Sequence, residues 1–99
     1  MNSALQEKIN HRIIVINKLK QELITRLNLP YASDDLHEDV ALLGAGLGLD
    51  SLDALEIVLC VENCFGVKIP DQSTPVLRSI NTIVDFVIAQ QAQKAVMAS

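Results

Sequence analysis

Apolar residues recur at helical spacing in three stretches of the chain, and no stretch alternates as a β-strand would. Over residues 4–28 this repeat predicts one long helix with an apolar stripe facing the core. The stripe consists of Leu5, Ile9, Ile13, Ile16, Leu23 and Leu27. Asn28 and Pro30 are expected to end the helix, because proline disfavours helical geometry in the residue before it. Ile14 and Val15 widen the stripe, either as core residues or as a self-association surface.

A second helix is predicted from Ser51 to about Phe65, with Gly66 in the left-handed position that often follows a helix. Its apolar residues at helical spacing are Leu52, Leu55, Ile57, Val58, Leu59, Val61 and Phe65. Ser79 is expected to cap the last helix, whose core residues would be Ile80, Ile83, Val84 and Val87. Before it, Pro75 fits only the first turn of a helix, so Thr74 as the cap predicts a very short helix there.

Residues 31–49 show no sustained periodicity, and a connection of this length is unusual in a compact domain. Val40, Leu42 and Leu43 are expected to anchor it to the core. The predicted fold class is all-α, a four-helix bundle of three long helices and one short helix, with a long loop between helices 1 and 2. We expect a single domain over residues 1–99, with its core at about 4–89 and a flexible tail at 90–99.

The charge is unevenly distributed along the chain, whose formal net charge is −4. Residues 1–28 contain five basic and two acidic side chains, whereas residues 29–99 contain three basic and ten acidic ones. Nucleic acid is an unfavourable partner for such a surface, since basic side chains must neutralise its phosphates. Proteins that dock on the acidic part should present basic side chains.

No apolar run approaches the roughly 18 residues that a membrane-spanning helix requires, and no signal-peptide pattern is present. These features predict a cytoplasmic protein, with Cys60 and Cys64 reduced. The two cysteines are one helical turn apart, but a structural zinc site has four ligands, and His11 and His37 are distant in sequence. We therefore expect the cysteines to act as small apolar core residues, and we predict no metal site.

Three glycines, Gly44, Gly46 and Gly48, lead into Asp50, Ser51 and Leu52 at the start of the second helix. Asp50 and Ser51 are both good N-cap residues. The pattern predicts an exposed serine hydroxyl at a loop-to-helix junction, where unpaired amides and the helix dipole favour a phosphate group. A purely structural interpretation is that Ser51 caps the helix, which is worth about 1 kcal/mol.

The segments LGLDSLDALE at 47–56 and FGVKIP at 65–70 resemble the acyl carrier proteins and their phosphopantetheine-binding relatives, and the resemblance extends over about residues 13–89. It implies that a phosphopantetheinyl transferase attaches a 4′-phosphopantetheine arm from coenzyme A to Ser51. The arm's thiol would hold acyl intermediates of fatty-acid, specialised lipid or polyketide-like synthesis as thioesters. Such a protein is not an enzyme, so no catalytic residues are expected.

The resemblance also implies a monomer that docks on acyl-transferring and chain-elongating enzymes through their basic patches. By position, the partner-binding residues would be the acids Asp50, Asp53, Glu56 and Glu62 and the exposed apolar residues Leu52 and Leu59.

The chain departs from the family at Gly46, where an acid is common, and at residues 72–75, which lack the usual acids. These departures favour a specialised pathway. Two alternatives stay open: a peptidyl or aminoacyl carrier, and a helical protein-interaction module with no prosthetic group.

Overall fold

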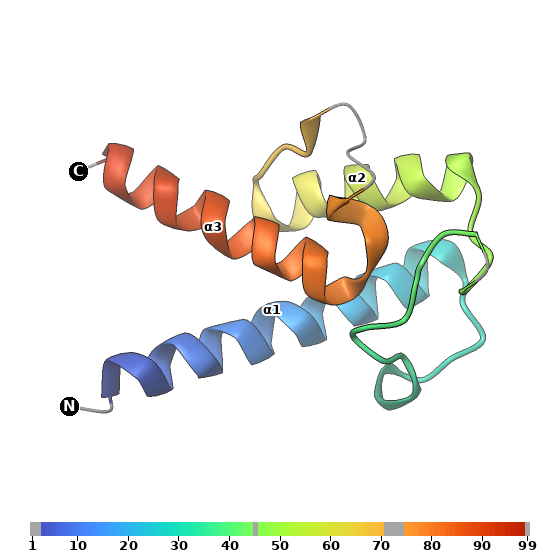
Figure 1. Cartoon of the computed structure of the whole chain (residues 1–99), viewed down its shortest axis with the longest axis horizontal. Helices are drawn as coiled ribbons and strands as arrows, with labels where there is room; N and C mark the ends of the chain where they lie inside the picture. The colour runs from blue at the N-terminus through green and yellow to red at the C-terminus, as the bar shows by residue number, and fades with distance from the viewer. Residues whose placement is uncertain (1–2, 45, 71–74, 99) are drawn as a thin grey trace.

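The computed structural model of the protein describes residues 3–44, 46–70 and 75–98, and this part of the chain is helical with no β-strand. Three α-helices, α1 (Ser3–Leu27), α2 (Ser51–Phe65) and α3 (Ile80–Ala98), are joined by connections that contain the short 3-10 turns η1 (Ser33–Asp35) and η3 (Val76–Arg78). Both termini lie at one end of the molecule, and α2 begins at the other (Figure 1). The predicted all-α class is confirmed.

Left-handed residues end the first two helices, at Gly66 as the sequence predicted and at Asn28, where the sequence predicted only that the helix ends. Asn28 follows α1 with φ 53°, and the amide of Leu29 donates to the carbonyl of Ile24 over 3.0 Å. Gly66 follows α2 with φ 67°, and its amide donates to the carbonyl of Glu62 over 3.0 Å. Both bonds satisfy carbonyls that a helix end leaves without partners.

The core lies where α1, α2 and α3 meet, and it is built from aliphatic side chains. Its fully buried members include Leu19, Leu23, Ile57, Val61, Ile80, Ile83, Val84 and Val87. The four residues predicted for the core face of the last helix are all among them, and Ile57, Val58 and Val61 supply the core face of α2. The prediction for the last helix is confirmed.

The predicted stripe on the first helix is wrong for its first half. Leu5, Ile9 and Ile13 are 45–60 % exposed, and Ile14 is 63 % exposed, whereas Val15, Leu19 and Leu23 are buried. With 25 residues against 15, α1 is about 15 Å longer than α2 at 1.5 Å per residue. Its first turns therefore extend beyond α2 towards the chain termini, where α1 and α3 diverge (Figure 1).

The long connection between α1 and α2 is held to the bundle by both apolar and polar contacts. Leu36 and Leu42 are buried, and Val40 and Leu43 are half-buried against the core, so the predicted anchoring is confirmed and Leu36 is added to it. Glu38 receives the ammonium of Lys20 at 3.4 Å, and its backbone carbonyl accepts from the amide of Asn81.

The expected short third helix corresponds to η3, a single 3-10 turn of three residues that Pro75 precedes. A fourth helix is thus not established, and Thr74, the predicted cap, lies outside the described residues. Ser79 caps α3 as predicted, because its hydroxyl accepts from the amide of Thr82 over 3.2 Å. Helical backbone continues to Ala98, whereas the sequence predicted a tail from residue 90.

No helix within the described ranges has the length and apolar character needed to cross a bilayer.

Substitutions in the two halves of α1 should differ sharply in effect. Leu19→Ala, which empties a fully buried position, is expected to lower the free energy of unfolding by about 2–5 kcal/mol. The matched change Leu5→Ala, at a 60 % exposed position, should stay within about 0.5 kcal/mol of the parent. Urea unfolding followed by circular dichroism measures both, and equal losses would contradict the assignment of the core to the second half of α1.

Candidate functional site

The start of α2 is fixed by two reciprocal hydrogen bonds between Asp50 and Asp53. The amide of Asp53 donates to Oδ1 of Asp50 over 3.0 Å, and the amide of Asp50 donates to Oδ2 of Asp53 over 3.0 Å. The bond from the Asp53 amide is the main reason that the pKa of Asp50 is lowered. Asp50 is therefore the N-cap of α2, with both orphan amides satisfied.

Because Asp50 supplies the cap, Ser51 is the first residue of the helix and has no capping role. Its side chain is exposed, and no hydrogen bond of its hydroxyl is found within the described part of the chain. Ser79 shows the contrasting arrangement: it is buried and bonded to Thr82 at the start of α3. The Ser51 hydroxyl is thus accessible for modification beside first-turn amides of α2.

The loop before Ser51 depends on a close approach that only glycine allows. A Cβ atom at Gly46 would lie 1.8 Å from the carbonyl oxygen of Ala41, and that same oxygen accepts from the amide of Leu47 over 2.9 Å. Gly48 adopts φ 75°, which side chains disfavour. The acid that carrier proteins commonly have at position 46 therefore does not fit this backbone, which explains the departure noted in the sequence.

The surface of α2 beyond Ser51 combines exposed apolar side chains with carboxylates. Leu52 is 75 % exposed, and Leu55 and Leu59 are each 42 % exposed. Three of the predicted contact acids already have partners inside the molecule. Asp50 and Asp53 accept from each other's backbone amides, and Glu56 lies 3.9 Å from the guanidinium of Arg26. Sequence reasoning missed Leu55, which it had treated as part of the helix repeat only.

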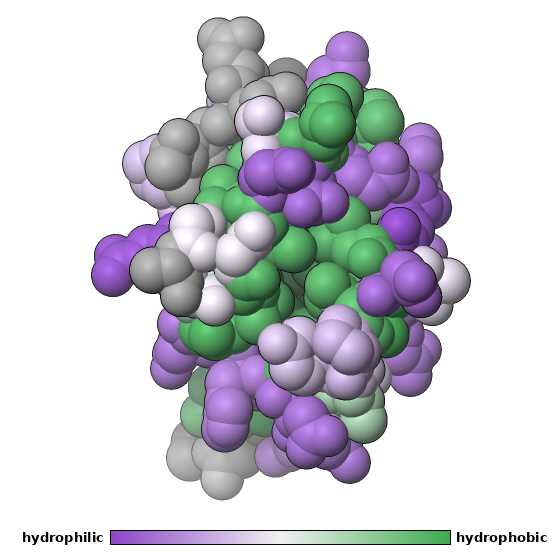
Figure 2. All heavy atoms as spheres, turned by 90° about the vertical axis from the view of Figure 1, so that its right-hand side faces the viewer, coloured by the Kyte–Doolittle hydropathy of each residue, from purple (hydrophilic) through white to green (hydrophobic). Residues whose placement is uncertain are grey.

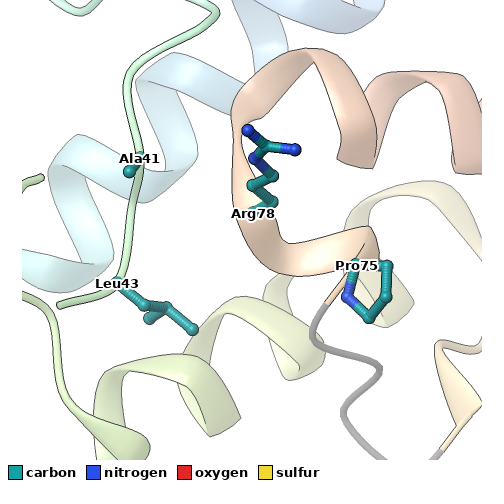
Figure 3. Close-up of a pocket in the computed structure, with 4 residues that line it drawn as sticks. All are labelled: Ala41, Leu43, Pro75 and Arg78. Atoms are coloured by element: carbon teal, nitrogen blue, oxygen red, sulfur yellow. The ribbon is translucent and has the colours of Figure 1, made fainter.

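A cavity of about 430 Å³ opens between the long connection and η3. Ala41 and Leu43 line one side, and Pro75 and Arg78 line the other (Figure 3). The end of the molecule where α2 begins shows apolar side chains around a hollow, with hydrophilic ones at its rim (Figure 2). Pro75 and Arg78 were not among the predicted site residues, since no motif marks them and only the fold sets them opposite the loop.

The family model described as "Phosphopantetheine attachment site" matches residues 17–87, which include the whole of α2 and its capped start. The chain belongs to this family. It is a carrier domain of the acyl carrier protein type, and the prosthetic group of the family is a covalently attached 4′-phosphopantetheine. The exposed Ser51 hydroxyl and the amides beside it fit such a phosphodiester-linked group.

Individual relatives of the chain are named acyl carrier proteins. The acyl carrier protein 2, mitochondrial, of Arabidopsis thaliana is 44 % identical over 48 residues, covering 48 % of this chain and 38 % of the relative. The mitochondrial acyl carrier protein of Saccharomyces cerevisiae is 32 % identical over 84 residues, covering 83 % of this chain and 62 % of the relative. The acyl carrier protein of Syntrophobacter fumaroxidans is 39 % identical over 46 residues, covering 46 % and 57 %. The carrier domain thus spans less than two thirds of these relatives' length.

The mitochondrial names of the plant and yeast relatives overturn the cytoplasmic location predicted from the sequence. That prediction depended on the lack of a membrane-spanning run and of a secretory signal. Neither feature distinguishes the cytoplasm from the interior of a mitochondrion, because a water-soluble carrier domain needs the same surface in both.

The Asp50 cap gives the carrier domain a defined acid-sensitive contribution to stability. Asp50→Ala should lower the free energy of unfolding by about 1 kcal/mol at neutral pH, as the loss of an N-cap does. The pKa of Asp50 is lower in the folded chain than in the unfolded chain, where it is about 3.9. The stabilisation that the ionised carboxylate contributes is therefore complete above about pH 3.9. It disappears as the pH falls through the pKa of the folded chain.

The matched variant is Asp50→Asn, which keeps a capping oxygen without a titrating charge. It should retain most of the stability at pH 7 and lose less than the parent as pH falls below about 4. Thermal unfolding of the three chains across this range measures the effect. An Asp50→Ala chain as stable as the parent at pH 7 would show that the cap contributes nothing.

Proposed function

We propose that Ser51 carries the 4′-phosphopantetheine arm and that this chain moves acyl groups between enzymes of fatty-acid or related lipid synthesis. One observation carries the proposal: Asp50 caps α2, so the Ser51 hydroxyl is exposed at the first residue of the helix. When bound, the arm supplies a terminal thiol to which the acyl group is joined. The residues of the chain have the separate tasks of presenting the hydroxyl, binding partners and sheltering the cargo.

Presentation of Ser51 follows from the local backbone. A transferase must bring the serine oxygen in line with a phosphate of coenzyme A, which requires an approach free of bulky neighbours. Gly48 precedes the site without a side chain, and Asp50 is turned back towards the amide of Asp53. The amides of the first turn also favour the negative charge of the phosphodiester that results.

The proposed docking surface is the exposed face of α2. Its apolar members are Leu52, Leu55 and Leu59, and its acids are Asp50, Asp53, Glu56 and Glu62. Basic patches on a phosphopantetheinyl transferase and on acyl-transferring or chain-elongating enzymes would complement these acids. Such rim charges mainly steer encounter, whereas the leucines supply the area that is buried on docking.

We propose the cavity between the long connection and η3 as the shelter for the acyl chain. Its lining atoms are mostly apolar, and it lies between segments that are not part of any long helix. Movement of a loop and a single turn requires less disruption than the separation of packed helices. In this proposal η3 represents the fourth, short helix of a carrier bundle, and residues 1–99 form one monomeric domain.

The names of the plant and yeast relatives support a mitochondrial location for this function. The departures at Gly46 and residues 72–75 support a specialised pathway, because the acids that general partners would meet there are absent.

Modification of the purified chain tests the attachment site. Incubation of the apo-protein with coenzyme A and a phosphopantetheinyl transferase should add the mass of one phosphopantetheinyl group, and Ser51→Ala should gain none. The control is Ser33→Ala, which replaces a serine of η1 in the long connection. This variant should be modified like the parent. Intact-protein mass spectrometry reads all three. A modified Ser51→Ala chain, or an unmodified parent, would refute the proposal.

The shelter is tested by narrowing the cavity. Loading the arm of the parent with a long acyl chain should raise the melting temperature, since each buried methylene contributes about 0.8 kcal/mol. Ala41→Phe places a ring at the cavity wall and should remove most of this increase. Ala32→Phe, at an exposed position of the same connection, is the matched control. The same increase in all three chains would place the acyl group elsewhere.

A further inference from the structure

Two cysteines and a glutamate meet between the second half of α2 and the neighbouring part of α1. Cys60 and Cys64 are one helical turn apart, and their Sγ atoms are separated by 4.0 Å. The two helices run in opposite directions (Figure 1), so that Glu22 of α1 lies beside both cysteines. One carboxylate oxygen of Glu22 and the two sulfurs all lie within 4.8 Å of one another. The sequence could not indicate this third donor.

We propose that Glu22, Cys60 and Cys64 form a binding site for one Zn²⁺ ion, with water as the fourth ligand. Two Zn–S bonds of about 2.3 Å at a tetrahedral angle hold their sulfurs about 3.8 Å apart, close to the observed 4.0 Å. A Zn–O bond of about 2.0–2.2 Å requires a sulfur–oxygen separation of about 3.5 Å. The Glu22 oxygen lies within 4.8 Å of each sulfur, so a side-chain rotation that moves it by about 1.3 Å or less is sufficient.

Arg26 provides the charge balance that such a site needs. Two thiolates and one carboxylate around Zn²⁺ leave a net charge of −1. The guanidinium of Arg26 lies 3.3 Å from Glu22, and this hydrogen bond, followed by the nearby Cys60, raises the pKa of Arg26. When Glu22 turns towards the ion, Arg26 keeps Glu56 as a second carboxylate at 3.9 Å. The cation therefore stays beside the anionic site without blocking the metal.

The three groups differ in burial. The half-buried ones give the ion a route from solvent, and the buried one gives it a water-poor binding position. Cys60 is fully buried, while Glu22 and Cys64 are half-buried and open the site towards solvent. Burial, followed by the neighbouring Cys64, raises the pKa of Cys60 to about 12, so the metal-free thiol is protonated at neutral pH. Only the thiolate coordinates the ion, so metal binding removes the proton of Cys60, and the new Zn–S bond offsets the cost of removing it.

Metal binding is measured on the full chain purified without its arm, so that no thiol of the prosthetic group takes part, and with a reductant that does not chelate metals. Titration with Zn²⁺ against a chromophoric chelator should give one ion per chain. Binding in weak buffer should release protons, because a thiol must be deprotonated to coordinate the metal. Co²⁺ in place of Zn²⁺ should produce thiolate-to-metal charge-transfer absorption. Zn²⁺ should also raise the melting temperature, since it binds only the folded chain.

Substitutions of each ligand decide the assignment. Cys64→Ser, at the half-buried cysteine, should weaken Zn²⁺ binding by about 100-fold or more, because loss of a direct ligand exceeds the effect of losing a supporting group. The charge-transfer band should decrease, because one of its two thiolates is lost. Glu22→Gln keeps a ligand oxygen but removes its charge, so it should weaken binding by about 10-fold. Glu7→Gln, an exposed acid on the same helix, is the matched control and should bind like the parent. Cys60→Ala repeats the test if its circular dichroism matches that of the parent.

Two results would overturn the proposal. The first is a parent chain that takes up no Zn²⁺, which would leave the cysteines as apolar core residues. The second is equal affinity in the parent, Cys64→Ser and Glu22→Gln, which would place the ion elsewhere. Neither result bears on Ser51, whose modification is measured separately.

Discussion

The reciprocal hydrogen bonds between Asp50 and Asp53 are the interaction on which the functional site depends. They determine where α2 begins, and the position of every residue on that helix follows from its first turn. Because the N-cap is Asp50, one residue before Ser51, the serine has helical backbone geometry but does not cap the helix. An accessible nucleophilic hydroxyl next to helix amides is a direct result of this one-residue offset.

The loop and η3 form a second unit, which is coupled by the backbone rather than by side chains. The amide of Leu42 donates to the carbonyl of Arg78 over 2.9 Å, and Leu42 itself is buried. This bond joins the two walls of the cavity at one edge. Leu43 lines one wall, and Pro75 lines the other. The core of the three helices thus supports the cavity. The long connection and η3, which form its walls, are the parts of the fold with the least regular structure.

The contact between α1 and α2 links the acidic surface to the basic first helix. Arg26 contacts both Glu22 on its own helix and Glu56 on α2. A basic partner that docks on Glu56 therefore competes with a cation that the protein already supplies. The uneven charge of the chain is in this way partly balanced within the fold. Asp50, Asp53 and Glu62 are the acids of this surface for which no ion pair is found among the described residues.

The sequence alone determined the features that depend on neighbouring residues: the start of α2 at Ser51, the end of α1 at Asn28, the left-handed Gly66, the Ser79 cap and the family motif around Ser51. Caps, turns and helical periodicity are local, so a short window contains their causes. Only the tertiary structure decided which half of the α1 stripe is buried, why position 46 must be glycine, and that Glu22 faces Cys60 and Cys64. The first and third outcomes depend on the relative lengths and directions of helices, and the second depends on how the loop folds back on Ala41. No single stretch of sequence encodes the distance between two helices.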